Sequence, residues 1–250
     1  NQGVYEHYVY WGNSTGDYDA QNRSELYGYY GTQAITDDVD QDGLVDLVIP
    51  FHNAYSGIFY GNSAGYSDTN SDLLNHYYAW DMAVADLNSD GYKDIVMCQH
   101  WDGDYDTLSG IWWNNYGQFD ESLTTFLPTN GCRDVDVVDA NQDGYLDLIF
   151  AAHYNNSYIT TSDVYYGSSM GYSGFNHESF LAQGTFRSSV GDLNGDGFPE
   201  MILNSYHDGS SYELNSQLYW GHPSGYAAGG STPLPSEGTW GEIQIVGAYP

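Results

Sequence analysis

The stretch DVDQDGLVD, from Asp38 to Asp46, is an acidic turn that leads directly into the apolar run LVIPF. Three further copies follow along the chain: DLNSDGYKD from Asp86, DANQDGYLD from Asp139 and DLNGDGFPE from Asp192. Each copy places oxygen-bearing side chains at positions 1, 3, 5 and 9 around a glycine at position 6. This arrangement wraps a hard cation such as calcium.

The residue at position 12 of each loop decides which kind of cation loop this is. An EF-hand or a dockerin-type loop needs a carboxylate there and a helix after it. The four residues at this position are Ile49, Met97, Phe150 and Leu203, within short runs rich in aliphatic and aromatic residues. Such runs are typical of buried strands. The loops are therefore predicted to join two strands, which excludes a calcium-switch helix pair.

We predict about four calcium ions, one in each loop, with a structural role. A hard ion enclosed by protein oxygens neutralises the loop and leaves no open position for a substrate. The alternative is a set of acidic turns without metal. The predicted ligands, with position 7 contributing its backbone carbonyl, are Asp38, Asp40, Asp42, Leu44 and Asp46; Asp86, Asn88, Asp90, Tyr92 and Asp94; Asp139, Asn141, Asp143, Tyr145 and Asp147; Asp192, Asn194, Asp196, Phe198 and Glu200.

A second pattern recurs with the same rhythm as the acidic loops. It consists of an aromatic pair, a turn that usually contains glycine and a further aromatic residue, which is typical of a strand that enters a hairpin. Corresponding aromatic residues stand at Trp11, Tyr60, Trp113, Tyr166 and Trp220. The chain is therefore a fivefold repeat of about 50 residues.

Repeats of this length with about four short strands each predict the blades of a β-propeller. Strand A precedes the acidic loop, strand B follows it, strand C contains the aromatic pair and strand D lies beyond the hairpin turn. No stretch has helical periodicity with caps, so we expect an all-β fold of about five four-stranded antiparallel blades, in one domain over 1–250.

The two ends of the chain bear on how the ring closes. Residues 238–250 align with 184–195 and are predicted to supply a fifth strand A without an acidic loop, while the N-terminus supplies strands C and D. We expect both termini to complete one blade and close the ring. Because most of that blade's strand B is missing, the fifth blade is thinner than the others, or the chain was cut from a larger propeller or polymer.

The D-x-[DN]-x-D-G-x-x-[DE] loop, the apolar strand after it and the aromatic-glycine hairpin resemble the FG-GAP/VCBS repeat of integrin α-subunit heads and of fungal and bacterial lectin-like propellers. The resemblance covers nearly the whole chain. It implies that calcium lies in the A–B loops and stiffens each blade. Members usually have seven blades, whereas this chain has room for five, Asn114 replaces the repeated glycine of the third unit, and the fifth loop is absent.

The charge balance excludes several classes of partner. The chain has 34 Asp and Glu against 4 Lys and Arg, for a formal net charge of −30. Nucleic acids and anionic membrane surfaces need basic clusters, so neither is expected as a partner. The acidic, lysine-poor surface is also compatible with a high-salt habitat.

Several features favour an extracellular location, secreted or at the cell surface. Calcium loops of this kind suit the millimolar calcium outside cells. N-glycosylation sequons occur at Asn13, Asn22 and Asn155, and no membrane-length apolar run or signal peptide is present, so we expect a mature processed product without membrane insertion. Cys98 and Cys132 fall on strands of adjacent units and form either a disulfide or two free buried thiols.

Other recurrent residues are candidates for binding a ligand. His52, His100 and His153 each lie 14 residues beyond the first Asp of their loop, and His207 lies 15 beyond, at the strand B to C connection. These imidazoles either bind a ligand or a softer metal, or make the same turn hydrogen bond in each blade. Asp81, Asp134 and Arg187 precede their loops by five residues and are expected to line the central channel, as an ion-pair network or as ligand-orienting groups.

The abundance of aromatic residues favours carbohydrate recognition, because aromatic faces stack on sugar rings. Trp101, on a long loop, is the tryptophan that we expect to be exposed. We therefore predict a calcium-stabilised extracellular adhesion module that recognises glycans or glycoproteins. The alternatives are a structural subunit of an extracellular filament or surface assembly, with like subunits as partners, and a polysaccharide-acting enzyme, for which no motif beyond scattered carboxylates argues. We assign no catalytic residue.

Overall fold

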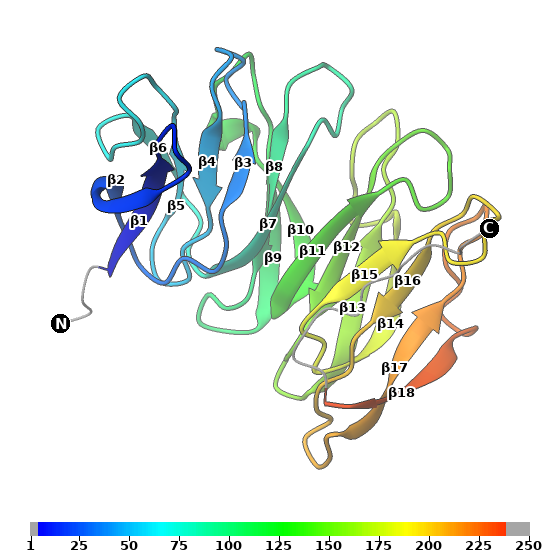
Figure 1. Cartoon of the computed structure of the whole chain (residues 1–250). Coiled ribbons are helices and arrows are strands. Elements are labelled where there is room, and N and C mark those ends of the chain that lie inside the picture. Colours follow the sequence, from blue (N-terminus) through cyan, green and yellow to red (C-terminus); the bar gives the residue numbers. More distant parts are fainter. Residues whose placement is uncertain (1–4, 239–250) are drawn as a thin grey trace.

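The computed structural model describes residues 5–238. These residues form 18 strands and one short 3-10 helix, and the sheets follow one another along an arc in chain order (Figure 1). Four of the five sheets have four antiparallel strands, and the N-terminal sheet has two. The prediction of an all-β propeller is therefore confirmed.

We number the sheets as blades 1 to 5. Blade 1 consists of β1 (Tyr5–Gly12) and β2 (Tyr18–Gly28). Blade 2 consists of β3 (Ile35–Asp37), β4 (Asp46–Ile49), β5 (Ser56–Phe59) and β6 (Ser71–Leu74). Blade 3 consists of β7 (Ala79–Ala85), β8 (Asp94–Gln99), β9 (Asp106–Trp112) and β10 (Thr125–Asn130), with the helix η1 (Glu121–Leu123) before β10.

The two remaining blades repeat this order. Blade 4 consists of β11 (Cys132–Val138), β12 (Asp147–Ala152), β13 (Ile159–Tyr165) and β14 (His177–Gln183). Blade 5 consists of β15 (Ser188–Gly191), β16 (Glu200–Leu203), β17 (Glu213–Tyr219) and β18 (Thr232–Glu237). In all four complete blades each strand pairs with the next along the chain, so they correspond to the predicted strands A to D.

Blade 1 contains only strands equivalent to C and D. The strand A predicted for residues 238–250, and with it the predicted closure by both termini, lies outside the described residues. No helix among residues 5–238 is long and apolar enough to span a membrane.

The hydrophobic core lies between neighbouring blades. Two adjacent residues of each strand C, one aliphatic and one aromatic, contribute to it on opposite faces of their sheet. An aliphatic side chain faces the next blade, where it packs in one cluster with an aromatic side chain, as Ile58 does with Trp112 and Val164 does with Tyr219. Alternation along a strand explains this arrangement, because successive side chains point to opposite faces. The aromatic residue is 1–2% exposed in blades 2 to 5, whereas its equivalent in blade 1, Tyr10, is 43% exposed.

The first strands of blades 2 to 5, namely β3, β7, β11 and β15, lie next to one another along the inner side of the arc. A disulfide joins two of these blades, from Cys98 in β8 to Cys132 at the start of β11, with a Cα–Cα distance of 5.4 Å. The connections between first and second strands leave the sheets at one end, and those between second and third strands leave at the other. The propeller therefore has two rims of different composition.

Candidate functional site

The four acidic loops occupy one rim and share one backbone conformation. Position 4 is left-handed in every loop, with φ of 61° at Gln41, 59° at Ser89, 57° at Gln142 and 76° at Gly195. Position 6 is always glycine and is left-handed as well, with φ between 89° and 94°. The left-handed residues at positions 4 and 6, one on each side of position 5, curl the loop inward. This brings the side chains of positions 1, 3 and 5 together.

The first loop shows most clearly that this arrangement fits a cation. One carboxylate oxygen from each of Asp38, Asp40 and Asp42 lies within 4.8 Å of the others. Asp38 Oδ2 accepts a hydrogen bond from the Gly43 amide at 2.9 Å, but Asp38 Oδ1 is buried without a hydrogen-bond partner. A buried carboxylate oxygen without a partner is costly, and a divalent cation would satisfy it. Among the described residues no other group of three acidic, histidine or cysteine side chains converges in this way.

The remaining three loops have asparagine at position 3, which contributes a neutral oxygen. In each of them the side chain of position 3 donates to the carboxylate of position 5, at 3.0 Å from Asn88 to Asp90, 3.2 Å from Asn141 to Asp143 and 3.0 Å from Asn194 to Asp196. The position-5 carboxylate also accepts the amide of position 7 in all four loops. The loops are therefore built alike, and the predicted ion in each remains a prediction.

The acid at position 9 connects the loop to the rest of its blade. Asp46, Asp94 and Asp147 are fully buried, and each accepts two backbone amides: one from position 2 of its own loop and one from the hairpin after strand C. Burial raises the pKa of Asp94 and of Asp147 to about 6, against the backbone hydrogen bonds that lower it. These carboxylates hold the acidic loop against the hairpin, whether or not they also contact an ion.

The opposite rim carries the recurrent histidines. The backbone amides of His52, His100 and His153 donate, at 3.2, 3.0 and 3.1 Å, to the carbonyl of an equivalent residue in the segment before strand A of their blade. A hydrogen bond shared by the same turn of each blade was one of the two explanations that we considered for the recurrence of histidine. Their rings form a row, with centroids 6.1 Å apart from His52 to His100 and from His100 to His153. The rings therefore pack on one another, and among the described residues these histidines do not form a group whose ligand atoms converge as at Asp38.

Burial and Arg133 keep this row of imidazoles neutral. Burial, assisted by the nearby guanidinium, lowers the pKa of His100 to about 3 and that of His153 to about 4. His100 Nδ1 lies 3.1 Å from the Gly131 carbonyl, and Arg133 Nη2 lies 3.2 Å from His100 Nε2. The arginine therefore donates to an unprotonated ring nitrogen, while Nδ1–H donates to the carbonyl.

Arg133 is itself held between two aromatic rings. Its guanidinium carbon lies 3.6 Å from the centre of the Trp80 ring and 5.0 Å from that of Phe186. Trp80, Arg133 and Phe186 occupy equivalent positions at the start of strand A in blades 3, 4 and 5. The sequence analysis missed this cation–π stack, although the alternation of aromatic and basic residues at one repeat position could have indicated it.

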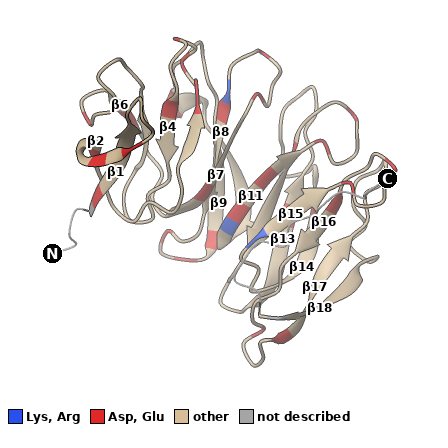
Figure 2. Ribbon diagram, in the orientation of Figure 1, with Lys and Arg blue, Asp and Glu red and all other residues tan. Residues whose placement is uncertain are grey.

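Asp81, Asp134 and Arg187 lie in or next to the first strands of blades 3 to 5, along the inner side of the arc, and form an ion-pair network. Arg187 lies 2.5 Å from Asp134 and 3.5 Å from Asp81. Burial and the adjacent Asp134 carboxylate raise the pKa of Asp81. The two acidic residues also bind across blade boundaries, because Asp81 accepts the Val135 amide at 3.0 Å and Asp134 accepts the Ser188 amide at 2.7 Å. Figure 2 shows acidic and basic positions close together along these inner strands.

Trp101 is not the most exposed tryptophan of the described residues. It is half-buried and packs edge-on against Tyr78, with ring centres 4.8 Å apart. Trp220, at the end of strand C in blade 5, is 45% exposed. The long loop around Trp101 suggested exposure, but the aromatic row of the rim extends far enough to cover one side of the indole.

The three sequons differ in how their asparagine side chains are engaged. Asn13 lies in the exposed β1–β2 turn, where Oδ1 accepts the amides of Thr15 and Asp17. Asn155 Nδ2 donates to Asn130 Oδ1 at 2.7 Å, and Asn22 Nδ2 donates to the Trp11 carbonyl at 2.9 Å. A glycan on Asn155 or Asn22 would displace an existing hydrogen bond.

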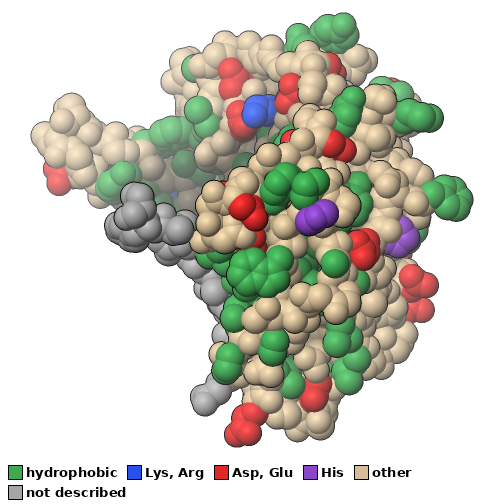
Figure 3. Space-filling model, turned by 90° about the vertical axis from the view of Figure 1, so that its right-hand side faces the viewer, with side chains coloured by type: hydrophobic (Ala, Val, Ile, Leu, Met, Phe, Trp, Pro, Cys, Tyr) green, Lys and Arg blue, Asp and Glu red, His purple; other side chains and the backbone are tan. Residues whose placement is uncertain are grey.

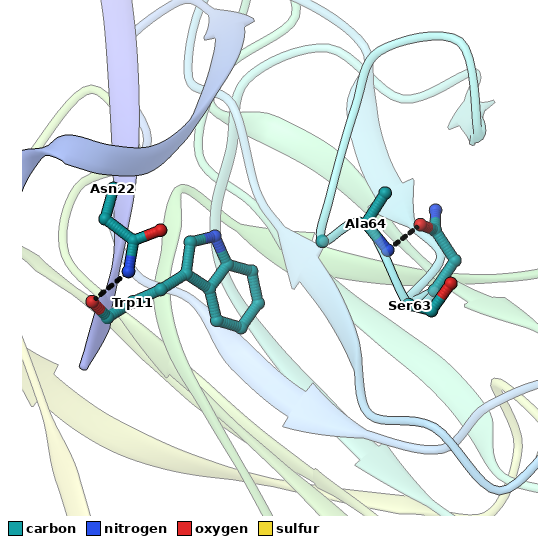
Figure 4. A pocket seen from close by; sticks show the side chains of 6 residues that line it. Trp11, Asn22, Ser63 and Ala64 are labelled. Atoms are coloured by element: carbon teal, nitrogen blue, oxygen red, sulfur yellow. Dashed lines mark hydrogen bonds between the residues drawn. The ribbon is translucent and has the colours of Figure 1, made fainter. Parts of the chain in front are cut away.

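Asn22 and Trp11 line a shallow pocket of about 240 Å³ between blade 1 and the β5–β6 hairpin (Figure 4). The indole of Trp11 stacks on Tyr66 at 5.4 Å and donates from Nε1 to Ser24 Oγ at 3.2 Å. The Ala64 amide across the pocket donates to the Asn62 side chain. Most polar groups of this pocket therefore already make hydrogen bonds within the protein.

A buried acid between blades 3 and 4 is a further feature that the sequence did not lead us to predict. Asp163, in β13, is 5% exposed and accepts a hydrogen bond from Ser179 Oγ at 2.6 Å. Burial raises its pKa to about 6, and it lines a pocket of about 230 Å³ with His177. Gly57 and Gly110 occupy the equivalent position in blades 2 and 3, so the departure from glycine was the available signal.

Comparison with known proteins gives the repeat its family. Residues 38–97, which contain the first two acidic loops, match the family model described as FG-GAP-like repeat. These residues therefore belong to an FG-GAP-like repeat, in a chain whose described residues fold as a β-propeller. The chain is 31% identical to human (Homo sapiens) integrin alpha-6 over 105 residues, which are 38% of this chain and 9% of that protein. It is 30% identical to chicken (Gallus gallus) integrin alpha-6 over 152 residues, 54% of this chain and 14% of that protein.

The chain thus spans a small part of the length of the curated relatives that it matches. Among solved structures, a chain in the crystal structure of BBS1N in complex with ARL6DN, soaked with lead, superposes with a TM-score of 0.53. The superposition covers 84% of this chain and 58% of that one at 10% sequence identity. At that identity the likeness concerns the fold alone.

Proposed function

We propose that this FG-GAP propeller is an extracellular, calcium-stabilised binding module that recognises glycans or glycoproteins. The observation that carries the calcium part is the convergence of Asp38, Asp40 and Asp42 around a buried carboxylate oxygen without a partner. Calcium would be held by side chains of positions 1, 3 and 5 in each loop, where it would supply positive charge to an acidic turn. The similarity to parts of integrin alpha-6 supports an adhesive role.

The disulfide and the charge distribution support the proposed location. A buried disulfide between Cys98 and Cys132 persists in oxidising compartments and is rare in the cytosol. Figure 3 shows acidic side chains scattered over one face among hydrophobic and neutral polar ones, with little basic surface. Such a surface favours neutral partners over polyanions.

The binding function is tested on the calcium-loaded protein with an array of glycans and of immobilised extracellular glycoproteins. Binding that is lost in EDTA and restored by calcium supports the proposal, because apo loops with unneutralised carboxylates should loosen the blades. A protein that binds calcium but none of the glycans or glycoproteins would refute the recognition part.

A second candidate function is that of a structural subunit in an extracellular assembly. The observation that favours it is the exposed outer face of blade 1, where Tyr10 is 43% exposed although its counterparts in the other blades are buried. The same face carries Tyr8 and Arg23, whose guanidinium lies 3.9 Å from the Tyr8 ring centre. Light scattering across a concentration series tests this: a constant monomer mass would exclude self-assembly through this face, whereas growing oligomers would support it.

A further inference from the structure

The histidine rim contains a pocket of about 400 Å³ next to blades 2 and 3. It is lined by Tyr30, Gly31, Thr32, His52, Asn53 and Trp80. Tyr30 to Thr32 come from the segment before β3, His52 and Asn53 from the β4–β5 turn, and Trp80 from β7. This volume falls within the range of small-molecule sites in proteins.

Two polar atoms of this pocket lack a partner. Thr32 Oγ1 and His52 Nε2 are both buried and make no hydrogen bond within the protein. Burial lowers the pKa of His52, with a further contribution from Arg133, so the imidazole is neutral at physiological pH. Buried polar groups are nearly always hydrogen-bonded, and two unsatisfied ones in one pocket indicate that a ligand or ordered water completes them.

The aromatic wall of the pocket is rigid. Arg133 stacks on Trp80 at 3.6 Å, and the His52 ring meets the indole edge-on at 4.8 Å. These contacts hold the indole in one orientation, so little side-chain entropy would be lost when a ligand packs on it. In the pocket of Figure 4, by contrast, Trp11 is already stacked on Tyr66 and its Nε1 already has an acceptor.

Tyr30 occupies a backbone position at which blades 4 and 5 have glycine and blade 3 has Tyr78, with φ of 59°. The φ of Tyr30 is 50°, and the equivalent residues of blades 4 and 5, Gly131 and Gly184, have φ of 40° and 59°. A left-handed conformation costs a non-glycine residue about 1 kcal/mol or more. The tyrosine is therefore kept at a position where glycine would be less strained, which is typical of residues retained for function.

The lining identifies the chemical class of the ligand. Among the described residues it contains no carboxylate and no cationic side chain, so these residues match neither a cation nor an anion. The flat indole and phenol suit the apolar face of a pyranose ring, while Thr32, His52 and Asn53 offer groups that exchange hydrogen bonds with hydroxyls. We propose that this pocket binds a neutral hexopyranose, with Trp80 and Tyr30 as the stacking surface. This assignment rests on the proposed glycan recognition and gives it a location.

The test measures binding of a panel of methyl glycosides of glucose, galactose, mannose, fucose and N-acetylglucosamine by calorimetry and saturation-transfer NMR. Thr32→Val removes one hydroxyl at constant shape and should weaken binding of the preferred glycoside about fivefold to tenfold. Trp80→Ala should weaken it at least about tenfold. Tyr30→Gly introduces the residue that blades 4 and 5 have, so it should fold normally and still lose affinity.

Matched variants make each outcome decisive. Trp220→Ala removes an exposed tryptophan far along the chain, and Thr69→Val removes an exposed hydroxyl. Both variants should bind the glycoside as the wild type does. If the wild type binds glycans but Tyr30→Gly and Thr32→Val leave affinity unchanged, the pocket is wrong while the proposed function stands. If no glycoside or array glycan binds but an arrayed glycoprotein does, the pocket assignment alone fails; if none of the glycosides, glycans or glycoproteins binds, both fail. Binding of a proline-rich peptide that depends on Trp80 but not on Thr32 would also overturn the sugar assignment.

Discussion

At the scale of single residues, the most informative positions are those that break the repeat. Asp163 replaces a glycine that in blade 3 leaves room for the indole of the residue two positions later; a Cβ at Gly110 would lie 2.3 Å from the Trp112 ring. Tyr30 and Tyr78 replace a left-handed glycine. The repeat made these departures visible in the sequence, but only the packing of neighbouring blades explains what each replacement does.

Asp163 should make stability depend on pH. Its pKa is raised to about 6 in the folded protein by burial, so the protonated acid favours the folded state below about pH 4 and this contribution is lost as pH rises through 6. Asp163→Asn should therefore gain stability relative to the wild type between pH 4.5 and 7.5, by about 2 kcal/mol. Urea unfolding at both pH values, with exposed Asp102→Asn as the control, measures this. A difference that does not change with pH would contradict it.

Gly131 should be far less tolerant of substitution than Gly171, which is also left-handed. A Cβ there would lie 2.0 Å from the Tyr154 carbonyl oxygen, whereas at Gly171 nothing lies within 4 Å. Gly171→Ala should cost about 1 kcal/mol from backbone strain alone, and Gly131→Ala about 3 kcal/mol or more because the strand must also move. Thermal unfolding of the two variants checks this, and equal losses would show that the Tyr154 backbone yields easily.

At the scale of elements, the acidic loop, the strand after it and the aromatic hairpin were all predictable from the sequence, because each depends on local spacing. The role of the position-9 acids was not, since their second hydrogen bond reaches the hairpin after strand C, as Asp94 reaches the Asn114 amide. For the recurrent histidines the sequence left two explanations open, a ligand or metal site and a shared turn hydrogen bond. The turn hydrogen bond became visible only in the backbone geometry. The rim pocket was missed because its six residues come from three segments.

The first loop allows a matched test of calcium binding. Asp40→Asn introduces the residue that the other three loops have at position 3, so calcium uptake should be retained. Asp42→Ala removes the aspartate that all four loops share at position 5, so calorimetric stoichiometry should fall by about one ion and the melting temperature in calcium should decrease. Unchanged stoichiometry in Asp42→Ala would show that this loop holds no ion.

At the scale of the whole molecule, the repeat predicted the number of sheets and also that the N-terminal residues supply only strands C and D of their blade. The fold class follows from periodicity, because five aromatic hairpins at regular intervals leave few alternatives to a propeller. The exposure of Tyr10 could not be read from the sequence, because burial of the same position elsewhere depends on the neighbouring blade. The proposed ring closure concerns residues beyond 238 and remains a prediction.

The disulfide should contribute strongly to the cohesion of blades 3 and 4. Cys98 and Cys132 are 34 residues apart, and closing a loop of that size stabilises a protein by about 4 kcal/mol in the chain-entropy model. The double variant Cys98→Ala/Cys132→Ala should melt well below the wild type. Dithiothreitol should lower the melting temperature of the wild type and leave that of the variant unchanged; equal melting temperatures of the oxidised proteins would contradict this role.

The separation of the two rims has an engineering consequence. The turns around Trp80 lie at the opposite ends of the strands from the acidic loops. A library randomised in these turns can therefore change the ligand that the protein binds while the acidic loops keep their sequence. The same geometry allows oriented attachment: a tether placed on the rim of the acidic loops would display every molecule with its histidine rim outward.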